Sequence, residues 1–196
     1  MVQMLNLLVD VSPEELFRTF MEKMGVDVNN PHFVDTPKRV VRMYEELLSG
    51  YKEPNFKLTT FEAPSKPSLI TVTNLSYYSL CLHHVVTFWG VAHIAYLPNK
   101  RIIGLSKFAR VVKHFAARLQ VQEELTEQIC DFLDEKLRPK AVAVMLTGEH
   151  LCMAARGIKS PNHTTVTTAM RGYFLEDGGS LKDEFFHVID LTTRGK

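Results

Sequence analysis

The spacing of apolar and polar residues predicts two helices near the start of the chain. Residues 12–15, with the sequence Ser-Pro-Glu-Glu, combine an N-cap serine, a proline at the first helical position and a glutamate three residues after the cap. A helix is therefore expected from there to about Met24. A second helix is expected to begin after residues 35–37 (Asp-Thr-Pro) and to end at the Ser-Gly pair at 49–50.

From residue 68 onward the pattern changes to strand-like runs that are rich in β-branched and aromatic residues. Between these runs we expect two amphipathic helices, one capped by Ser106 with an apolar face reaching Leu119, and one from about Gln122 to Leu137. The expected strands cover residues 69–75, 85–97, 141–146 and 164–174, with a shorter one at 150–155.

The order strand, strand, helix, helix, strand, strand favours an α+β fold, in which an antiparallel sheet carries a helical layer on one face. Residues 51–67 lack a sustained period and are rich in Pro, Lys, Glu and Thr, so we interpret them as a linker. We therefore expect an N-terminal helical appendage and linker at 1–67 and the main domain, with any active site, at 68–196.

The charge balance and the cysteine content exclude several classes of protein. Among 196 residues, 23 Lys and Arg balance 22 Asp and Glu, so no global field draws the chain to nucleic acid or to an anionic membrane. No membrane-spanning run or signal-peptide pattern is found, and a cytoplasmic location is expected. Cys81, Cys130 and Cys152 are too few and too far apart for a disulfide framework, so their thiols are free to bind metal.

Two short segments gather residues that can bind a metal ion. Cys81, His83 and His84 lie within four residues, and His150 and Cys152 follow in a later strand-like run. Thiolates and imidazoles are ligands that Zn²⁺ prefers. Alternate residues of a strand share a face, which would let the later pair enter one site, whereas the earlier segment needs a turn or bulge. Spacing leaves open which of the two adjacent histidines binds the metal.

Two cysteines and one histidine would leave a fourth tetrahedral position open, which is typical of catalytic zinc. Zinc in such a site lowers the pKa of a bound water molecule to about 7, and further histidines could transfer protons near that pH. The alternative is that the cysteines are core residues and the histidines are structural. The clustering of five metal-competent side chains weakens this alternative, which we keep for Cys130 because it lies on the apolar side of its helix.

Several basic and polar residues could hold an anionic, base-containing ligand. Helix starts favour anions, and each of these residues could equally be a solvated surface side chain. Gln122 and Glu123 could present an amide and a carboxylate to the edge of a base. The basic and hydroxyl candidates are Ser106, Lys107, Arg110, Arg156, Arg39 and Arg42.

With these residues in view, the sequence closely resembles the GTP cyclohydrolase I family. The resemblance extends from about Thr36 to Phe174 and rests on five motifs in the same order. They are the sequence Thr-Pro-Lys-Arg-Val at 36–40 with Met-Tyr at 43–44 and Ser-Gly at 49–50, residues 81–84, Gly-Leu-Ser-Lys at 104–107, Gln-Val-Gln-Glu at 120–123, and Glu-His-Leu-Cys-Met at 149–153 with Arg-Gly at 156–157.

The resemblance implies a role for each candidate residue. Cys81, His84 and Cys152 match the zinc ligands of the family, and His83 and His150 match its proton-transfer histidines. Glu123, beside Gln122, matches the residue that recognises guanine. Positions around the triphosphate are matched by Ser106, Lys107, Arg110 and Arg156, with Arg39 and Arg42 contributed by another subunit.

The resemblance also implies a fold, an assembly and a reaction. The tunnelling fold joins the antiparallel sheets of several subunits into a barrel, and the family typically forms a homodecamer of two pentamers. The reaction uses Zn²⁺ and water to open the imidazole ring of GTP, releases formate and closes dihydroneopterin triphosphate. Such a product would feed pterin, folate or deazaguanine synthesis.

Three positions depart from the family pattern. Leu82 replaces the usual glutamate between the cysteine and the histidine pair, and Leu119 replaces a proline. Residues 161–163, with the sequence Pro-Asn-His, replace a glycine and a small residue, so the loop there is expected to differ in shape.

Two alternative functions remain open from the sequence. One is a relative that uses dGTP or stops after ring opening, and the other is a non-catalytic zinc protein that serves assembly or regulation. Retention of His83, His150, Glu123 and Lys107 disfavours the second, because a structural metal needs none of them. Nitrile reductases of the deazaguanine type share the fold, but we find no motif carrying their cysteine nucleophile.

Overall fold

The computed structural model describes residues 11–54, 56–176 and 179–193. Contacts between residues divide the chain into two compact units, Met1–Leu48 and Ser49–Lys196. Residues 49–67 therefore group with the second unit, and part of the segment interpreted as a linker forms regular structure. No helix in the described part of the chain has the length and apolar character needed to cross a membrane.

The first unit contains the two helices that the sequence predicts. Helix α2 (Pro13–Lys23) begins at a capping box, in which the Ser12 hydroxyl accepts a hydrogen bond from the Glu15 backbone N–H while the Glu15 carboxylate accepts from the Ser12 backbone N–H. Helix α3 (Thr36–Leu47) follows and contacts α2. Both predictions are confirmed.

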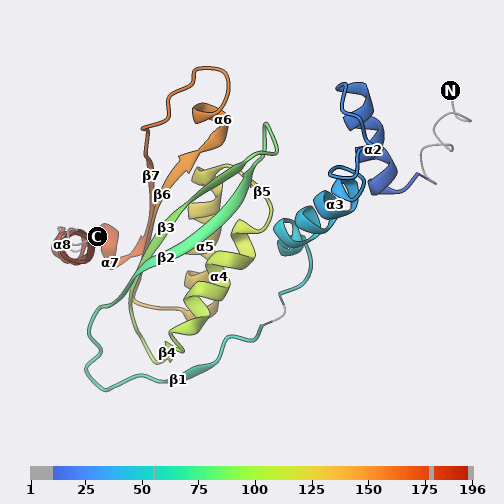
Figure 1. The fold of residues 1–196 in the computed structure, drawn as a ribbon. Coiled ribbons are helices and arrows are strands. Elements are labelled where there is room, and N and C mark those ends of the chain that lie inside the picture. The colour runs from blue at the N-terminus through green and yellow to red at the C-terminus, as the bar shows by residue number, and fades with distance from the viewer. Residues whose placement is uncertain (1–10, 55, 177–178, 194–196) are drawn as a thin grey trace, which may run out of the picture. The chain divides into compact units, whose positions relative to one another are not determined.

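A five-stranded sheet forms the centre of the second unit (Figure 1). Four strands pair antiparallel along the sheet, and the short fifth strand runs parallel to its neighbour at one edge. In spatial order the strands are β5 (Leu119–Gln120), β2 (Ile70–Cys81), β3 (Thr87–Leu97), β6 (Ala141–His150) and β7 (Thr165–Gly172). A separate small sheet pairs β1 (Thr60–Glu62) with β4 (Arg101–Ile103), and a 3₁₀ turn, η1, covers Ser49–Tyr51.

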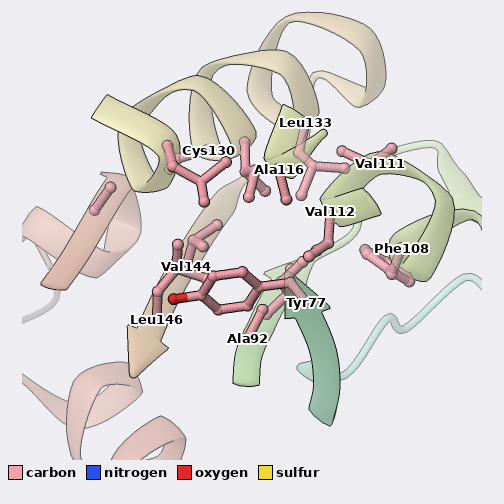
Figure 2. Close-up of a cluster of buried hydrophobic side chains, with 14 of the residues drawn as sticks. Tyr77, Ala92, Phe108, Val111, Val112, Ala116, Cys130, Leu133, Val144 and Leu146 are labelled. Atoms are coloured by element: carbon pink, nitrogen blue, oxygen red, sulfur yellow. The ribbon is translucent and has the colours of Figure 1, made fainter. Parts of the chain in front are cut away.

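Helices α4 (Ser106–Ala116) and α5 (Gln122–Leu137) cover one face of this sheet, as the α+β expectation required (Figure 1). Figure 2 shows the core between these helices and the sheet, where Phe108, Val112 and Leu133 from the helices face Ala92 and Val144 from the strands. Cys130 is fully buried here, and burial raises the pKa of its thiol to about 12. Its interpretation as a core residue is confirmed.

The opposite face of the sheet carries a second core, which the sequence analysis did not anticipate. Strand residues of the other parity, such as Ala95 and Ala143, pack there with Phe174 and Phe185. These aromatic side chains come from α7 (Tyr173–Glu176) and α8 (Ser180–Thr193).

Three local expectations were wrong. Strand β2 continues beyond residue 75 to Cys81, past an irregularity between Val72 and Leu75. Ser106 is the first residue of α4 and not its cap, since Leu105 occupies the cap position without a side-chain bond. The segment expected as a strand at 150–155 forms the short helix α6 (Leu151–Ala154).

Candidate metal centre and active site

The corner between β2 and β3 positions the first two candidate ligands. Cys81 is the last residue of β2, and its backbone N–H donates to the Val86 carbonyl at 2.8 Å while the Val85 N–H donates back to the Cys81 carbonyl at 2.8 Å. Val85 adopts φ of 54°, a left-handed value that is rare for a β-branched residue. This tight turn places His84 Nδ1 3.8 Å from Cys81 Sγ. The turn that the sequence required is present.

The third candidate ligand, Cys152, reaches the corner through the topology of the sheet. Strand β6 runs antiparallel to β3, and His150 at its end pairs with Phe88 at the start of β3. The chain then enters α6, which carries Cys152 back over the corner. His150 and Cys152 therefore do not share a strand face, and the reason that the sequence analysis gave for their proximity was wrong.

Cys81, His84 and Cys152 form one group whose candidate ligand atoms all lie within 4.8 Å of one another. The thiol of Cys152 has a raised pKa, first because it is partly buried and then because Cys81 lies beside it. A cation at their centre would relieve this by stabilising the thiolates. Two sulfur ligands and one nitrogen ligand fit the preferences of Zn²⁺.

His150 lies next to this group but is held by other partners. Its ring stacks on Phe88 with centroids 4.5 Å apart and an interplanar angle of 4°. Its Nε2 lies 2.9 Å from Gln122 Oε1. Burial lowers the pKa of His150, nearby His163 lowers it further, and Glu123 opposes both.

The surroundings of Gln122 determine which nitrogen of His150 carries a proton. The Gln122 Nε2 donates to the carbonyls of Leu146 and Thr165 and to Thr167 Oγ1, at 3.1 to 3.3 Å. Carbonyls only accept, so the amide nitrogen must face them and Oε1 must face His150. His150 Nε2 therefore donates, and in the neutral ring its Nδ1 carries no proton.

Gln122 was expected to face a ligand, yet it is 1% exposed and its amide is used inside the protein. A glycine provides the space it needs: a Cβ on Gly148 would overlap Gln122 Oε1 and come within 2.9 Å of the Tyr77 hydroxyl. Gln122 is thus the partner that orients His150.

His83 and Arg156 lie on the solvent side of the ligand group. His83 is exposed, with its ring centroid 6.2 Å from that of His84, and it does not belong to the ligand group. Arg156 Nη1 lies 2.7 Å from His84 Nε2. Since arginine only donates, His84 Nε2 accepts this bond, and Nδ1 is the ring nitrogen on the side of Cys81.

Glu123 stands at the start of α5, beside a surface depression of about 350 Å³. The depression is lined by Glu123, Glu124, Thr126, Glu127, Thr167 and Thr168. Within this lining, the hydroxyl oxygens of Thr126 and Thr167 are hydrogen-bonded at 2.6 Å. Thr167 Oγ1 also accepts a hydrogen bond from Gln122 Nε2. The depression that Glu123 lines therefore reaches, through Thr167, the hydrogen bonds that hold His150.

Apart from Arg156, the basic and hydroxyl candidates occupy two regions of the chain. Ser106, Lys107 and Arg110 lie in the first turns of α4 in the second unit, and Ser106 and Arg110 are exposed. Arg39 and Arg42 are exposed on α3 of the first unit, where Arg39 forms a 3.3 Å ion pair with Asp35.

Sequence reasoning missed two contributors to this site. From the sequence, Phe88 could be interpreted only as part of a strand. Its stacking on His150 follows from the pairing register of β3 with β6, which the hydrophobic pattern does not specify. His163 was noted only as part of an unusual loop, yet it accepts a hydrogen bond from the His150 backbone N–H.

Comparisons with known proteins identify the family of this chain. The sequence model of the GTP cyclohydrolase I family matches residues 13–190. The chain is 45% identical to GTP cyclohydrolase 1 of Aquifex aeolicus over 177 residues, covering 90% of this chain and 94% of the relative. It is 44% identical to the enzyme of that name from Clostridium perfringens over 182 residues, covering 91% and 96%.

Among solved structures, the chain is similar to the crystal structure of the archaeosine synthase QueF-Like in the apo form, with a TM-score of 0.46 and 18% identity. That similarity covers 55% of this chain and 97% of the other. The sequence matches span both segments that carry Cys81, His84 and Cys152, together with almost all of the described helices and strands. The chain belongs to the GTP cyclohydrolase I family.

Proposed function

We propose that this chain is a zinc-dependent GTP cyclohydrolase I, which opens the imidazole ring of GTP with water, releases formate and yields 7,8-dihydroneopterin triphosphate. The observation that carries the proposal is the convergence of Cys81, His84 and Cys152 beside His150. These residues come from segments about seventy positions apart in the sequence. Family membership supports the same reaction.

Cys81, His84 and Cys152 would hold the zinc ion, which would supply Lewis-acid activation of water at neutral pH. His84 would bind through Nδ1, the nitrogen that faces Cys81. Its Nε2 would then carry the proton and could no longer accept from Arg156. Metal binding would therefore release the guanidinium of Arg156 toward another acceptor.

The proton-transfer groups in this proposal are His150 and His83. Purine C8 becomes a better electrophile when N7 is protonated, so a histidine beside the metal centre has a direct use. In His150 the available atom is Nδ1, because Nε2 is committed to Gln122. His83 is exposed on the same corner, where its ring is accessible to solvent.

Glu123 is the residue proposed to read the guanine edge. A carboxylate can accept hydrogen bonds from both N1–H and the 2-amino group of guanine. The depression beside Glu123 supports this role, since it is lined by carboxylates and threonine hydroxyls. Glu123 itself directly follows Gln122 in the sequence. We assign Gln122 to substrate binding only indirectly, through its contact with His150.

The triphosphate is proposed to bind the cationic groups of the family motifs. Lys107, Ser106 and Arg110 lie in the first turns of α4, where backbone N–H groups favour an anion. Arg156, released from His84, would join them. Arg39 and Arg42 would come from the first unit of another subunit.

An assembly of several copies belongs to the same proposal. We propose the tunnelling fold, with sheets joined between subunits into a barrel and a homodecamer as the typical size. A cytoplasmic location also belongs to it, supported by three free cysteines, two of which are needed as reduced zinc ligands.

The test is incubation of the zinc-loaded protein with GTP, followed by an assay for formate and by fluorescence of the oxidised pterin. Both products are expected. Formate without a pterin would instead identify a relative that stops after ring opening, and a strong preference for dGTP would identify one with a different substrate. If protein that retains zinc forms neither formate nor a pterin, the result would favour the non-catalytic alternative.

A further inference from the structure

The loop after β6 carries a histidine that contacts the backbone of the proposed proton-transfer residue. His163 Nε2 lies 3.2 Å from the His150 backbone nitrogen, and His163 Nδ1 lies 2.6 Å from the Ser160 carbonyl oxygen. It is half-buried, and its ring centroid is 6.2 Å from that of His150. This histidine stands in the part of the loop where the sequence departs from the family pattern.

The two partners of His163 fix its protonation pattern. A backbone N–H can only donate, so His163 Nε2 must accept and carries no proton. A backbone carbonyl can only accept, so Nδ1 must carry the proton. His163 thus bridges two backbone groups as a neutral ring with one donor and one acceptor.

This bridge closes the loop that carries Cys152 and Arg156. Within the loop, α6 is held by the bond from the Ala155 N–H to the Leu151 carbonyl and by the bond from the Ser160 N–H to the Met153 carbonyl, both 2.9 Å. Neither of those bonds involves the His163 side chain. The His163 bridge instead ends at His150, where β6 stops pairing with β3.

We propose that His163 is a positioning residue that sets the orientation of His150. The His150 side chain is held at its tip by Gln122 and across its face by Phe88, and His163 holds its backbone. Loss of the backbone bond would let the end of β6 shift, and the Nδ1 atom of His150 would shift with it. The inference rests on the proposed GTP cyclohydrolase activity.

The test compares three variants of the full chain, each loaded with zinc. His163→Phe keeps a ring but removes both hydrogen bonds, whereas His163→Gln keeps an amide that can donate and accept with similar spacing. Asn162→Ala changes an exposed neighbour in the same loop and is the matched control. The measurements are kcat and KM for GTP, bound zinc per chain and the thermal midpoint.

We expect His163→Phe to lower kcat by about 10- to 100-fold, the usual effect of a small misplacement of a reacting group, with KM and bound zinc nearly unchanged. His163→Gln should recover most of that loss, and Asn162→Ala should match the wild type. Wild-type kcat in His163→Phe would overturn the inference, as would a His163→Gln variant equally impaired. Loss of zinc in proportion to kcat would also overturn it, because the residue would then serve the metal ligands.

A measurement on the unmutated protein keeps the inference testable if His163→Phe does not fold. In ¹⁵N-histidine spectra, the signal that disappears in His163→Gln should show protonated Nδ1 and unprotonated Nε2. The opposite tautomer would contradict the bridge. If the wild type itself fails to act on GTP, the proposed function is at fault, and the tautomer still reports on His163 separately.

Discussion

At the scale of single residues, the site depends on hydrogen bonds whose direction is fixed by their partners. Carbonyl groups around Gln122 orient its amide, the amide then orients His150, and the backbone groups around His163 do the same for that ring. This series of hydrogen bonds tolerates little change, because each buried polar group that loses its partner lowers the free energy of unfolding by about 1 to 3 kcal/mol.

The lack of a side chain at Gly148 is predicted to be essential for this network. In Gly148→Ala the new methyl group would overlap Gln122 Oε1 and force the amide away from His150. We expect a loss of stability of about 1 to 3 kcal/mol and a lower kcat. Gly104→Ala is the control for stability, since a Cβ there has its nearest neighbour at 3.8 Å. Equal thermal midpoints for the two variants would contradict the prediction.

His93 provides a pH-dependent prediction. It is 1% exposed, its Nδ1 has no hydrogen-bond partner, and burial lowers its pKa from 6.5. The unfolded chain therefore binds a proton at His93 more readily than the folded one, and stability is lost as the pH falls below about 6.5 toward the lowered folded-state pKa. Above that range the effect is absent.

The variant His93→Leu should flatten the pH dependence of unfolding below about 6.5 while leaving it unchanged at higher pH. His114 and His150, whose pKa values are also lowered by burial, will retain part of the slope. The measurement is chemical denaturation at a series of pH values. An unchanged slope in His93→Leu would contradict this prediction.

At the scale of helices and strands, local patterns predicted those elements whose signals lie within the element. Helix α2 follows from its capping box, and α5 from its apolar spacing at the bounds that were expected. Segment 150–155 was misjudged because its apolar residues fit a strand, whereas strand pairing ends where β3 begins. The candidate metal ligands were predictable by residue type, but the partners of His150 were not, since they depend on sheet register and loop closure.

The capping box of α2 gives a prediction at this scale. Ser12→Ala removes the acceptor of the Glu15 N–H and should destabilise the helix start by about 1 kcal/mol. Hydrogen exchange at the Glu15 amide is the measurement, and faster exchange is expected. Ser12→Thr keeps the hydroxyl and should exchange almost as slowly as the wild type. Identical exchange rates for Ser12→Ala and the wild type would show that the Ser12 hydroxyl does not stabilise the start of α2.

At the scale of the whole molecule, we propose that the site is shared between subunits. Arg39 belongs to the first compact unit and Cys152 to the second, so an Arg39→Ala chain keeps an intact metal centre while a Cys152→Ser chain keeps the proposed phosphate contact. Mixed assemblies of these two weakly active variants should recover a measurable fraction of activity, since some sites would have both good halves. No recovery in verified mixed oligomers would mean that each subunit completes its own site.

We propose that Cys81, His84 and Cys152 hold the zinc ion needed to open the guanine ring. The most direct measurement is formate release from GTP during titration of zinc into protein stripped of metal. For the wild type, formate release should be absent without zinc and should rise to a plateau at one zinc per chain, and Cys152→Ser should stay inactive throughout. Full formate release by the stripped protein, or by Cys152→Ser, would show that zinc held by these three residues is not required for the reaction.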